Sequence, residues 1–426
     1  MNWIPGFNFC ALALCAVLGS GCGTQVSDPL APVDPSTYRV DYQVVPDSAD
    51  ATVRVTMRVA QSRFLLRELS FKPGPHMRNI RADGELSIDS TGATWQPSET
   101  GGAMSWEVAV AHRRNGDGYD AWLGPDFGLF RAEDIIPRAA SRTAKGAGSE
   151  TWLSFRLPAT WSAVTEYYDD NGRIRIDNPE RRFDQPSGWI VIGDLGVRRE
   201  RIAGVRVAVA GPVGHSIRRL ETIALLNWTL PELARILPEL PPRLTIVSAG
   251  YPMWRGGLSA PQSMFVHAER PLISENATST LLHEIMHMSL GFKAADDHDW
   301  IVEGMAEYYS LQLLRRSGTI TPERYADAVA DLAVWAEEAD HLCAAVSTGA
   351  TTALAVGIFD ALDVEIAERT EGGASIDDLA SALWQFDKAV DVGVLTEITE
   401  NLTGAKPDAL HSDNLLGCRT IAREST

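Results

Sequence analysis

The sequence predicts a multidomain protein of the α+β class, with a β-rich N-terminal half and a mostly helical C-terminal half. Between residues 38 and 209, apolar and polar residues alternate, which is typical of antiparallel strands with one buried face. From residue 211 onward, apolar residues recur at helical spacing. The chain has 426 residues, which is long enough for two or three domains.

The composition is that of a folded protein with an acidic surface. Hydrophobic residues make up 45% of the chain and charged residues 22%, which excludes a largely disordered or fibrous protein. Lys and Arg number 38 against 56 Asp and Glu, so the formal net charge is −18. This charge disfavours nucleic acid as the main partner, and it disfavours adsorption to anionic lipid through basic patches.

The N-terminus resembles an export signal. The apolar run at residues 10–18 is too short for a membrane-spanning helix, which needs about 20 apolar residues, but it suits a signal-peptide core. Three small residues and then Cys22 follow it, as in bacterial lipoprotein signals. We therefore expect residues 1–21 to be removed and Cys22 to be lipidated. Simple secretion and a cytosolic location are the alternatives.

This interpretation predicts where the protein works. Residues 22–36 are rich in Pro, Ser and Asp and lack periodicity, so we expect a lipidated tether. The protein would then lie in the cell envelope facing the periplasm and contact the membrane only through its lipid. Gly23 does not match the aspartate that often retains lipoproteins in the inner membrane, which favours the outer membrane.

Two cysteines are left in the mature chain besides the anchor. Cys343 and Cys418 show no metal-site spacing. In an oxidising compartment a remaining pair of cysteines suggests a disulfide. Two buried free thiols are the alternative.

The predicted N-terminal domain spans residues 37–210 and is an antiparallel β-sandwich. Two of its strands are marked by alternating apolar residues, with a turn at residues 46–50 between them: Tyr38, Val40, Tyr42 and Val44 in the first, and Val53, Val55, Met57 and Val59 in the second. The stretch 137–149 has the composition of a loop.

The predicted catalytic domain spans residues 211–340, and a helical C-terminal region spans 341–426. We expect a helix over 217–237 that is interrupted near Pro231, because proline removes a helical hydrogen bond. Thr321 and Pro322 form a helix start. The other predicted elements are strands at 244–247 and 265–267 and helices at 276–292 and 300–316.

Residues 282–288 read Leu-His-Glu-Ile-Met-His-Met and carry the strongest functional signal. His283 and His287 are four residues apart, so on a helix they share one face and can bind one metal ion. Glu284 lies between them, where its carboxylate can reach a metal-bound water. Considered alone, the pattern also fits a core helix with satisfied histidines.

Acidic residues of the next predicted helix extend this site. Glu303 can supply the third protein ligand of a His₂Glu site for one zinc ion, which leaves one position for water. Glu307 lies one turn further along and can accept a hydrogen bond from a ligand histidine. The alternative for Glu307 is a solvated surface carboxylate.

The motifs LLHEIMH and IVEGMAEYYS resemble those of the gluzincin metallopeptidases, and the glycyl aminopeptidase-like family is the most similar branch. Three further features agree with that family: a preceding β domain, the segment YPMWRGGL at 251–258, and the C-terminal stretch 362–384. The resemblance implies a thermolysin-like zinc-peptidase domain with a helical tail. It also implies that Gly256, Gly257 and Leu258 form a strand that aligns an extended peptide substrate.

The sequence departs from the family at two places. Ser259 occupies the position of a glutamate that binds the free amine of the substrate in related aminopeptidases. The stretch 351–357 lacks the tyrosine that the family uses in the transition state. Another group must then act as transition-state donor, and the candidates are Tyr308, Tyr309, Tyr325, His298 and His267.

The predicted function is a zinc-dependent peptidase of the cell envelope acting on peptides or proteins. The zinc held by His283, His287 and Glu303 would lower the pKa of its bound water to about 7, and Glu284 would accept the proton of that water. Whether it is an aminopeptidase or an endopeptidase is left open. The alternatives are a degenerate zinc-binding relative that serves as a binding or scaffold lipoprotein, and a metal-free structural lipoprotein.

Overall fold

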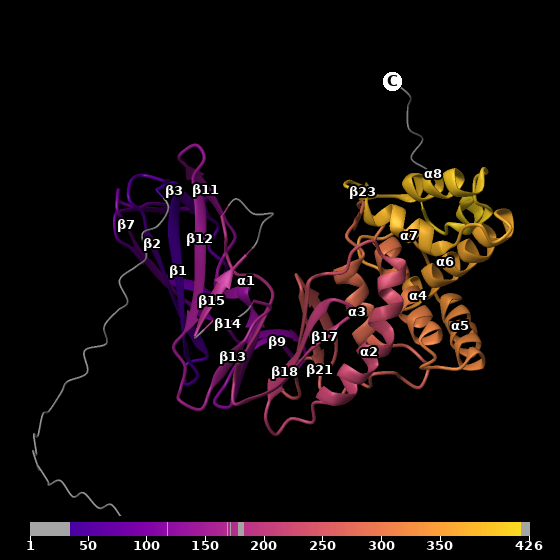
Figure 1. Cartoon of the computed structure of the whole chain (residues 1–426), viewed down its shortest axis with the longest axis horizontal. Helices are drawn as coiled ribbons and strands as arrows, with labels where there is room; N and C mark the ends of the chain where they lie inside the picture. The colour runs from indigo at the N-terminus through magenta and orange to yellow at the C-terminus, as the bar shows by residue number, and fades with distance from the viewer. Residues whose placement is uncertain (1–34, 117, 168, 171, 178–182, 419–426) are drawn as a thin grey trace, which may run out of the picture.

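The computed structural model describes residues 35–116, 118–167, 169–170, 172–177 and 183–418. The predicted signal, the lipidation site Cys22 and most of the tether lie outside the described residues. Sheets fill the N-terminal side of the molecule and helices the C-terminal side (Figure 1), so the α+β class is confirmed. No helix in the described part of the chain is long and apolar enough to cross a membrane.

Three sheets build the N-terminal half. A seven-stranded sheet has the order β14-β15-β12-β1-β2-β7-β4, a five-stranded sheet the order β13-β16-β10-β9-β8, and a four-stranded sheet the order β11-β3-β6-β5. The strands of the first sheet are β1 (Thr37–Asp47), β2 (Thr52–Ala60), β4 (Met77–Ala82), β7 (Gly101–Ala109), β12 (Gly148–Phe155), β14 (Asp169–Asp170) and β15 (Arg173–Ile176). The strands of the other two sheets are β3 (Leu66–Phe71), β5 (Glu85–Asp89), β6 (Gly92–Gln96), β8 (His112–Asn115), β9 (Gly118–Leu123), β10 (Phe127–Arg131), β11 (Ala139–Thr143), β13 (Ser162–Val164) and β16 (Trp189–Gly193).

The alternating pattern of β1 and β2 buries one face of the largest sheet. Tyr42 and Val55, for example, lie in one core with Trp95 of the four-stranded sheet and Ile190 of the five-stranded sheet. The half is therefore built of sheets packed over a shared core, as predicted. It is not wholly antiparallel, because β1 pairs in parallel with β12. This pairing joins segments that are far apart in the chain, so no local turn sequence predicts it.

A further five-stranded sheet with the order β17-β18-β19-β21-β20 lies between the β-rich half and the helices (Figure 1). Its strands are β17 (Leu195–Ile202), β18 (Val205–Pro212), β19 (Arg243–Ala249), β20 (Gly257–Ala260) and β21 (Ser263–His267). The predicted domain boundary between residues 210 and 211 cuts through this sheet. Strand β17 pairs with β18, and β18 pairs with β19, so two strands that precede residue 211 belong to the same sheet as strands that follow it.

The helices lie on the side of this sheet that points away from the β-rich half (Figure 1), where α2 (Arg219–Ile236) and α3 (Thr280–Ser289) pack against its strands and the others pack against helices. These others are α4 (Trp300–Arg316), α5 (Pro322–Ala336), α6 (Ala350–Arg369), α7 (Ile376–Trp384) and α8 (Val392–Thr403). Short elements complete the fold: α1 (Ala132–Ile135), β22 (Lys293–Ala294), β23 (Ala389–Val390), η1 (Asp408–Leu410) and η2 (Ser412–Asn414).

The predicted interruption at Pro231 is wrong, because α2 runs through it. Pro231 lacks the N–H that would bond the carbonyl one turn earlier. Leu226, Leu230 and Leu233 on both sides of it are buried in the helical core. Burial of about three such side chains is worth several kcal/mol, which offsets the loss of one hydrogen bond.

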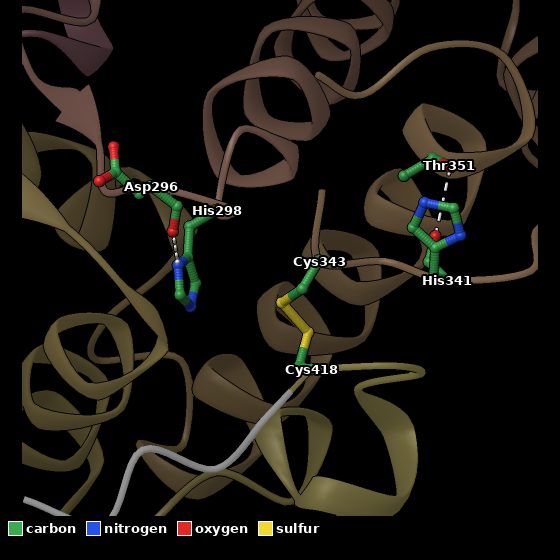
Figure 2. Close-up of a disulfide and its surroundings, with 6 residues drawn as sticks. All are labelled: Asp296, His298, His341, Cys343, Thr351 and Cys418. Atoms are coloured by element: carbon green, nitrogen blue, oxygen red, sulfur yellow. Dashed lines mark hydrogen bonds between the residues drawn. A yellow bond between two sulfur atoms is a disulfide. The ribbon is translucent and has the colours of Figure 1, made fainter. Parts of the chain in front are cut away.

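The C-terminal segment is tied back to the helices by a disulfide. Cys343 and Cys418 are bonded, the pairing that the sequence suggested (Figure 2). The N–H of Leu342 also donates to the carbonyl of Leu416 at 2.7 Å. The end of the described chain is therefore fixed next to the segment that precedes α6.

Candidate metal centre

Helix α3 carries the first half of the site. Ser279 caps the helix by accepting a hydrogen bond from the N–H of Leu282 at 3.3 Å. The apolar side chains of α3 are buried in the helical core: Leu281, Leu282, Ile285 and Met286. His283, Glu284 and His287 therefore fall on the part of the helix that is not packed into this core, where all three are half-buried.

Helix α4 carries the second half and is held by tight packing against α6. Gly304 makes this possible, because a Cβ at that position would lie 2.4 Å from the Cβ of Ala355. Its neighbour Glu303 is thereby fixed with its carboxylate toward α3. In the Glu-Gly pair of the motif, Glu303 is thus the candidate ligand, and Gly304 lets α4 pack closely against α6.

The nitrogen and oxygen atoms of three side chains converge between α3 and α4. The Nε2 atoms of His283 and His287 are 3.0 Å apart. The Glu303 carboxylate lies 3.3 Å from each of them, through Oε2 to His283 and through Oε1 to His287. Donor atoms around a tetrahedral zinc ion are separated by about 3.3 Å when each bond is about 2.0 Å long. The three side chains therefore form a group that could hold a metal ion.

Glu307 fixes the orientation of one ligand. Its Oε2 lies 2.8 Å from Nδ1 of His283. A proton on Nδ1 is donated to this carboxylate, so the lone pair of Nε2 points into the group. Glu307 therefore makes the predicted contact with a candidate ligand histidine. It is not a solvated surface carboxylate, which was the alternative.

The electrostatics of the group favour positive charge. Burial opposes the charged form of His283, but hydrogen bonds to Glu303 and Glu307 outweigh it and raise the pKa of His283 to about 10. Burial likewise opposes ionisation of Glu303, but hydrogen bonds from His283 and His287 lower the pKa of Glu303 to about 2. Carboxylates held ionised in a half-buried position are a suitable environment for a cation.

Glu284 lies between the metal-binding group and the edge strand β20. A Cβ added at Gly257 would lie 3.0 Å from Cγ and 3.2 Å from Oε1 of Glu284, and 2.7 Å from Cγ2 of Thr280. Only glycine lets the backbone of β20 come this close to α3. The structure thus places the start of the predicted substrate strand directly beside the predicted general base.

The segment that carries this site is similar to a known protein family. The family model of the M61 glycyl aminopeptidases matches residues 281–353, which include the metal-binding group. This match covers only part of the chain, so it establishes a similarity of this segment to the M61 glycyl aminopeptidases and not the family of the whole chain. No curated protein sequence shows significant similarity to it.

Three solved structures share the fold of this chain. An aminopeptidase N family protein from Idiomarina loihiensis is 17% identical with a TM-score of 0.63, over 87% of this chain and 72% of that one. An M1 zinc metallopeptidase from Deinococcus radiodurans is 14% identical with a TM-score of 0.53, over 88% of this chain and 92% of that one. Yeast LTA4 hydrolase is 14% identical with a TM-score of 0.51, over 87% of this chain and 65% of that one.

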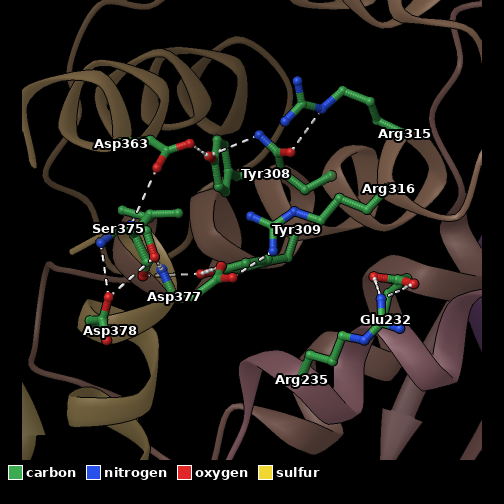
Figure 3. A network of polar contacts seen from close by, with 12 residues as sticks. Glu232, Arg235, Tyr308, Tyr309, Arg315, Arg316, Asp363, Ser375, Asp377 and Asp378 are labelled. Carbon is green, nitrogen blue, oxygen red and sulfur yellow. Dashed lines mark hydrogen bonds and ion pairs between the residues drawn. The ribbon is translucent and has the colours of Figure 1, made fainter. Parts of the chain in front are cut away.

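The hydroxyls of the three tyrosines proposed as donors contact other groups, and Figure 3 shows two of them, Tyr308 and Tyr309. Tyr308 donates to Oδ2 of Asp363 at 2.7 Å, and Tyr309 donates to Oδ1 of Asp377 at 3.1 Å. The hydroxyl of Tyr325 accepts from Nε2 of Gln312 at 2.8 Å. These hydroxyls anchor α4 to its neighbouring helices, and the structure does not bring them to the metal-binding group.

The two candidate histidines also contact other groups. His298 is half-buried, and its Nδ1 lies 2.8 Å from the carbonyl of Asp296, in the surroundings of the disulfide (Figure 2). His267 is buried and its Nδ1 accepts from the N–H of Glu269 at 3.2 Å. Among the described residues, no hydrogen bond or ion pair joins a predicted donor to His283, His287 or Glu303.

The β-rich half supports β20 through contacts that were not predicted from the sequence. The indole Nε1 of Trp189 donates to the carbonyl of Leu258 at 2.9 Å. Tyr119 pairs with Met253 in an isolated parallel bridge, just before the strand. Both contacts join residues far apart in the chain, so no local pattern could have revealed them.

Proposed function

We propose that this protein is a zinc-dependent peptidase, with one zinc ion held by His283, His287 and Glu303. The convergence of their donor atoms within 4.8 Å of one another carries the proposal. Two imidazoles and a carboxylate match the zinc ligands of catalytic sites in type and number. When bound, such an ion acidifies a water and polarises a carbonyl group.

Glu284 is the general base of the proposed reaction. Its carboxylate lies one residue from the first ligand and beside the backbone of β20. It accepts the proton of the attacking water and returns it to the leaving amine. Glu307 holds His283 in the tautomer that leaves Nε2 free.

The edge strand β20 aligns the substrate in this proposal. The N–H of His267 on β21 donates to the carbonyl of Gly256 at 2.9 Å. Because bonded and non-bonded pairs alternate in an antiparallel ladder, the peptide groups of Gly257 and Ser259 then face away from β21. An extended peptide adding to this edge would lie beside Glu284, as in a thermolysin-like catalytic domain.

The proposed place of action is the cell envelope, facing the periplasm. The signal-like segment ending at Cys22 supports a lipid anchor. The disulfide between Cys343 and Cys418 supports an oxidising compartment. Mass spectrometry of the mature N-terminus tests this, since lipidated Cys22 is the expected first residue.

A peptide-library digest with and without a chelator tests the function. We expect cleavage that the chelator abolishes and that added Zn²⁺ restores. The same digest with N-terminally blocked peptides separates an aminopeptidase from an endopeptidase. Ser259 at the usual amine-binding position favours cleavage of blocked peptides as well. Stoichiometric zinc with no cleavage would instead support the non-catalytic binding or scaffold role.

A further inference from the structure

Strand β20 lies between the two halves of the molecule and has a different neighbour on each face. Gly257 faces α3, where an added Cβ would meet Thr280 and Glu284. The next residue, Leu258, packs with the core cluster that includes Trp189 of β16. Because successive residues of a strand point to opposite faces, α3 and the β-rich half hold β20 from its two sides.

Trp189 makes two hydrogen bonds to the hairpin formed by β20 and β21. Its indole Nε1 donates to the carbonyl of Leu258 on β20 at 2.9 Å, and its backbone N–H donates to Oγ of Ser263 on β21 at 2.8 Å. The side chain is fully buried, and the centre of its ring lies 5.5 Å from that of Phe265. Trp189 is thus attached to both strands of the hairpin, while β16 is paired with β10 and β13 of the β-rich half.

The bond to Leu258 leaves the free edge of β20 open. In the ladder with β21, Gly256 is a bonded position, because its carbonyl accepts from the N–H of His267 at 2.9 Å. Bonded positions recur at every second residue, so the peptide groups of Leu258 also point toward β21. A carbonyl oxygen has two lone pairs and can accept from Trp189 and from β21 together. Trp189 therefore fixes β20 without competing with a peptide that pairs at its free edge.

The residue before Trp189 lies close to the turn of the same hairpin. Gly188 has a φ of +81°, and a Cβ there would lie 2.4 Å from Oγ of Ser263 and 3.0 Å from the carbonyl oxygen of Pro261. The N–H of Gly188 donates to Oε2 of Glu133 at 3.0 Å, which ties this residue to the β-rich half. The close approach at the turn and the two bonds of Trp189 together set the distance between β20 and the β-rich half.

We propose that Trp189 is a positioning residue, through which the β-rich half holds β20 at the distance from Glu284 that hydrolysis requires. The inference rests on the proposed peptidase function. Loss of the indole bond on one face of β20 would free the strand to move relative to Glu284 on the other face. A displacement of about 1 Å at a catalytic centre can cost about 100-fold in rate.

Trp189→Phe tests the proposal, because it removes the indole N–H and keeps an aromatic ring. Trp106→Phe is the matched control, since Trp106 is also buried and its Nε1 donates to the carbonyl of Ile135 at 2.7 Å, within the β-rich half. Each variant loses one buried indole bond, so we expect similar falls in the urea midpoint. Only Trp189→Phe should lower kcat, by about 10–100-fold at full zinc content. The KM should change less, because the peptide still pairs with β20.

Hydrogen exchange measured by mass spectrometry is a second readout that does not need activity. We expect residues 257–260 to exchange at least about tenfold faster in Trp189→Phe and at the original rate in Trp106→Phe. Ser263→Ala removes the acceptor of the Trp189 N–H and should shift kcat and exchange in the same direction by less. This variant carries the comparison if Trp189→Phe does not fold.

Two results overturn the proposal: equal kcat in the two tryptophan variants, or equal exchange of residues 257–260 in both. A different result belongs to the proposed function. If the unchanged protein cleaves no peptide, the peptidase assignment fails, and the exchange measurement alone decides whether Trp189 holds β20 in place.

Discussion

Helix α4 carries polar side chains on two sides that differ in access to solvent. Toward α3, the side chains of Glu303 and Glu307 are 25% and 14% exposed and contact the two histidines. Toward α6 and α7, Tyr308 and Tyr309 are buried, and their hydroxyls bond to Asp363 and Asp377 (Figure 3). Glu307 and Tyr308 are adjacent in the sequence, yet one belongs to a site that could hold a metal ion and the other to the packing of helices.

This difference shows what distinguishes a site from a structural network. The tyrosine network is closed, because each hydroxyl already has a protein partner. The carboxylate side instead brings lone pairs of two imidazoles and one carboxylate toward the same point. Variants on the two sides should therefore separate metal binding from stability.

Glu303→Gln is expected to have the largest effect. The amide keeps the size of the side chain but loses its charge. Zinc affinity should therefore fall by more than about 10–100-fold, which is the loss typical when a residue that contacts a ligand, and not the metal itself, is changed. Metal analysis after dialysis measures the loss. Glu338→Gln, on an exposed glutamate, is the control. Full zinc retention in Glu303→Gln would show that Glu303 is not a zinc ligand.

Gly257→Ala tests whether the close approach of the edge strand β20 to Glu284 is needed for turnover. The added Cβ collides with Glu284 and Thr280, so we expect peptide turnover to fall by about 100-fold while zinc stays bound. Gly357→Ala is the matched control, because a Cβ there meets no atom within 4 Å. Equal activity of the two variants would show that contact between β20 and Glu284 does not matter.

Glu307→Gln tests the partner of the ligand histidine. Zinc affinity should fall by about 10–100-fold, since the amide orients His283 less firmly than a carboxylate. Competition with a chromophoric chelator gives the affinity. A value equal to that of the unchanged protein would mean that Glu307 has no role in metal binding.

Tyr308→Phe is expected to act on stability and not on catalysis. The variant leaves Oδ2 of Asp363 without its donor, which costs about 1–3 kcal/mol of unfolding free energy. Urea denaturation measures this cost, and Tyr251→Phe, at an exposed position, is the control. Turnover per bound zinc should be unchanged. A large loss of turnover at unchanged stability would instead indicate that Tyr308 acts as the transition-state donor.

The metal-binding group was predictable because its information is local. His283 and His287 are one helical turn apart, and the run of apolar neighbours sets which face of α3 is buried. Alternation in β1 and β2 is local in the same way. Such patterns fix which residues share a face, but not what that face contacts.

The features that sequence analysis missed depend on contacts between distant segments. The parallel pairing of β1 with β12, the sheet that crosses the predicted boundary at residue 210, and the bond from Trp189 to Leu258 are examples. The continuation of α2 through Pro231 likewise depends on tertiary packing that outweighs a local rule. The predicted donors Tyr308 and Tyr309 were plausible from their position alone, and only their partners on α6 and α7 place them in the core.

Glu284→Gln tests the central claim most directly, namely that the metal-binding group between α3 and α4 is a hydrolytic zinc centre. The variant keeps the shape of the side chain and removes the base. We expect stoichiometric zinc together with a fall in peptide turnover of about 10²–10⁴-fold or more, both measured on one preparation. Unchanged turnover at full zinc occupancy would contradict the account, because the carboxylate assigned as the base would then not be needed.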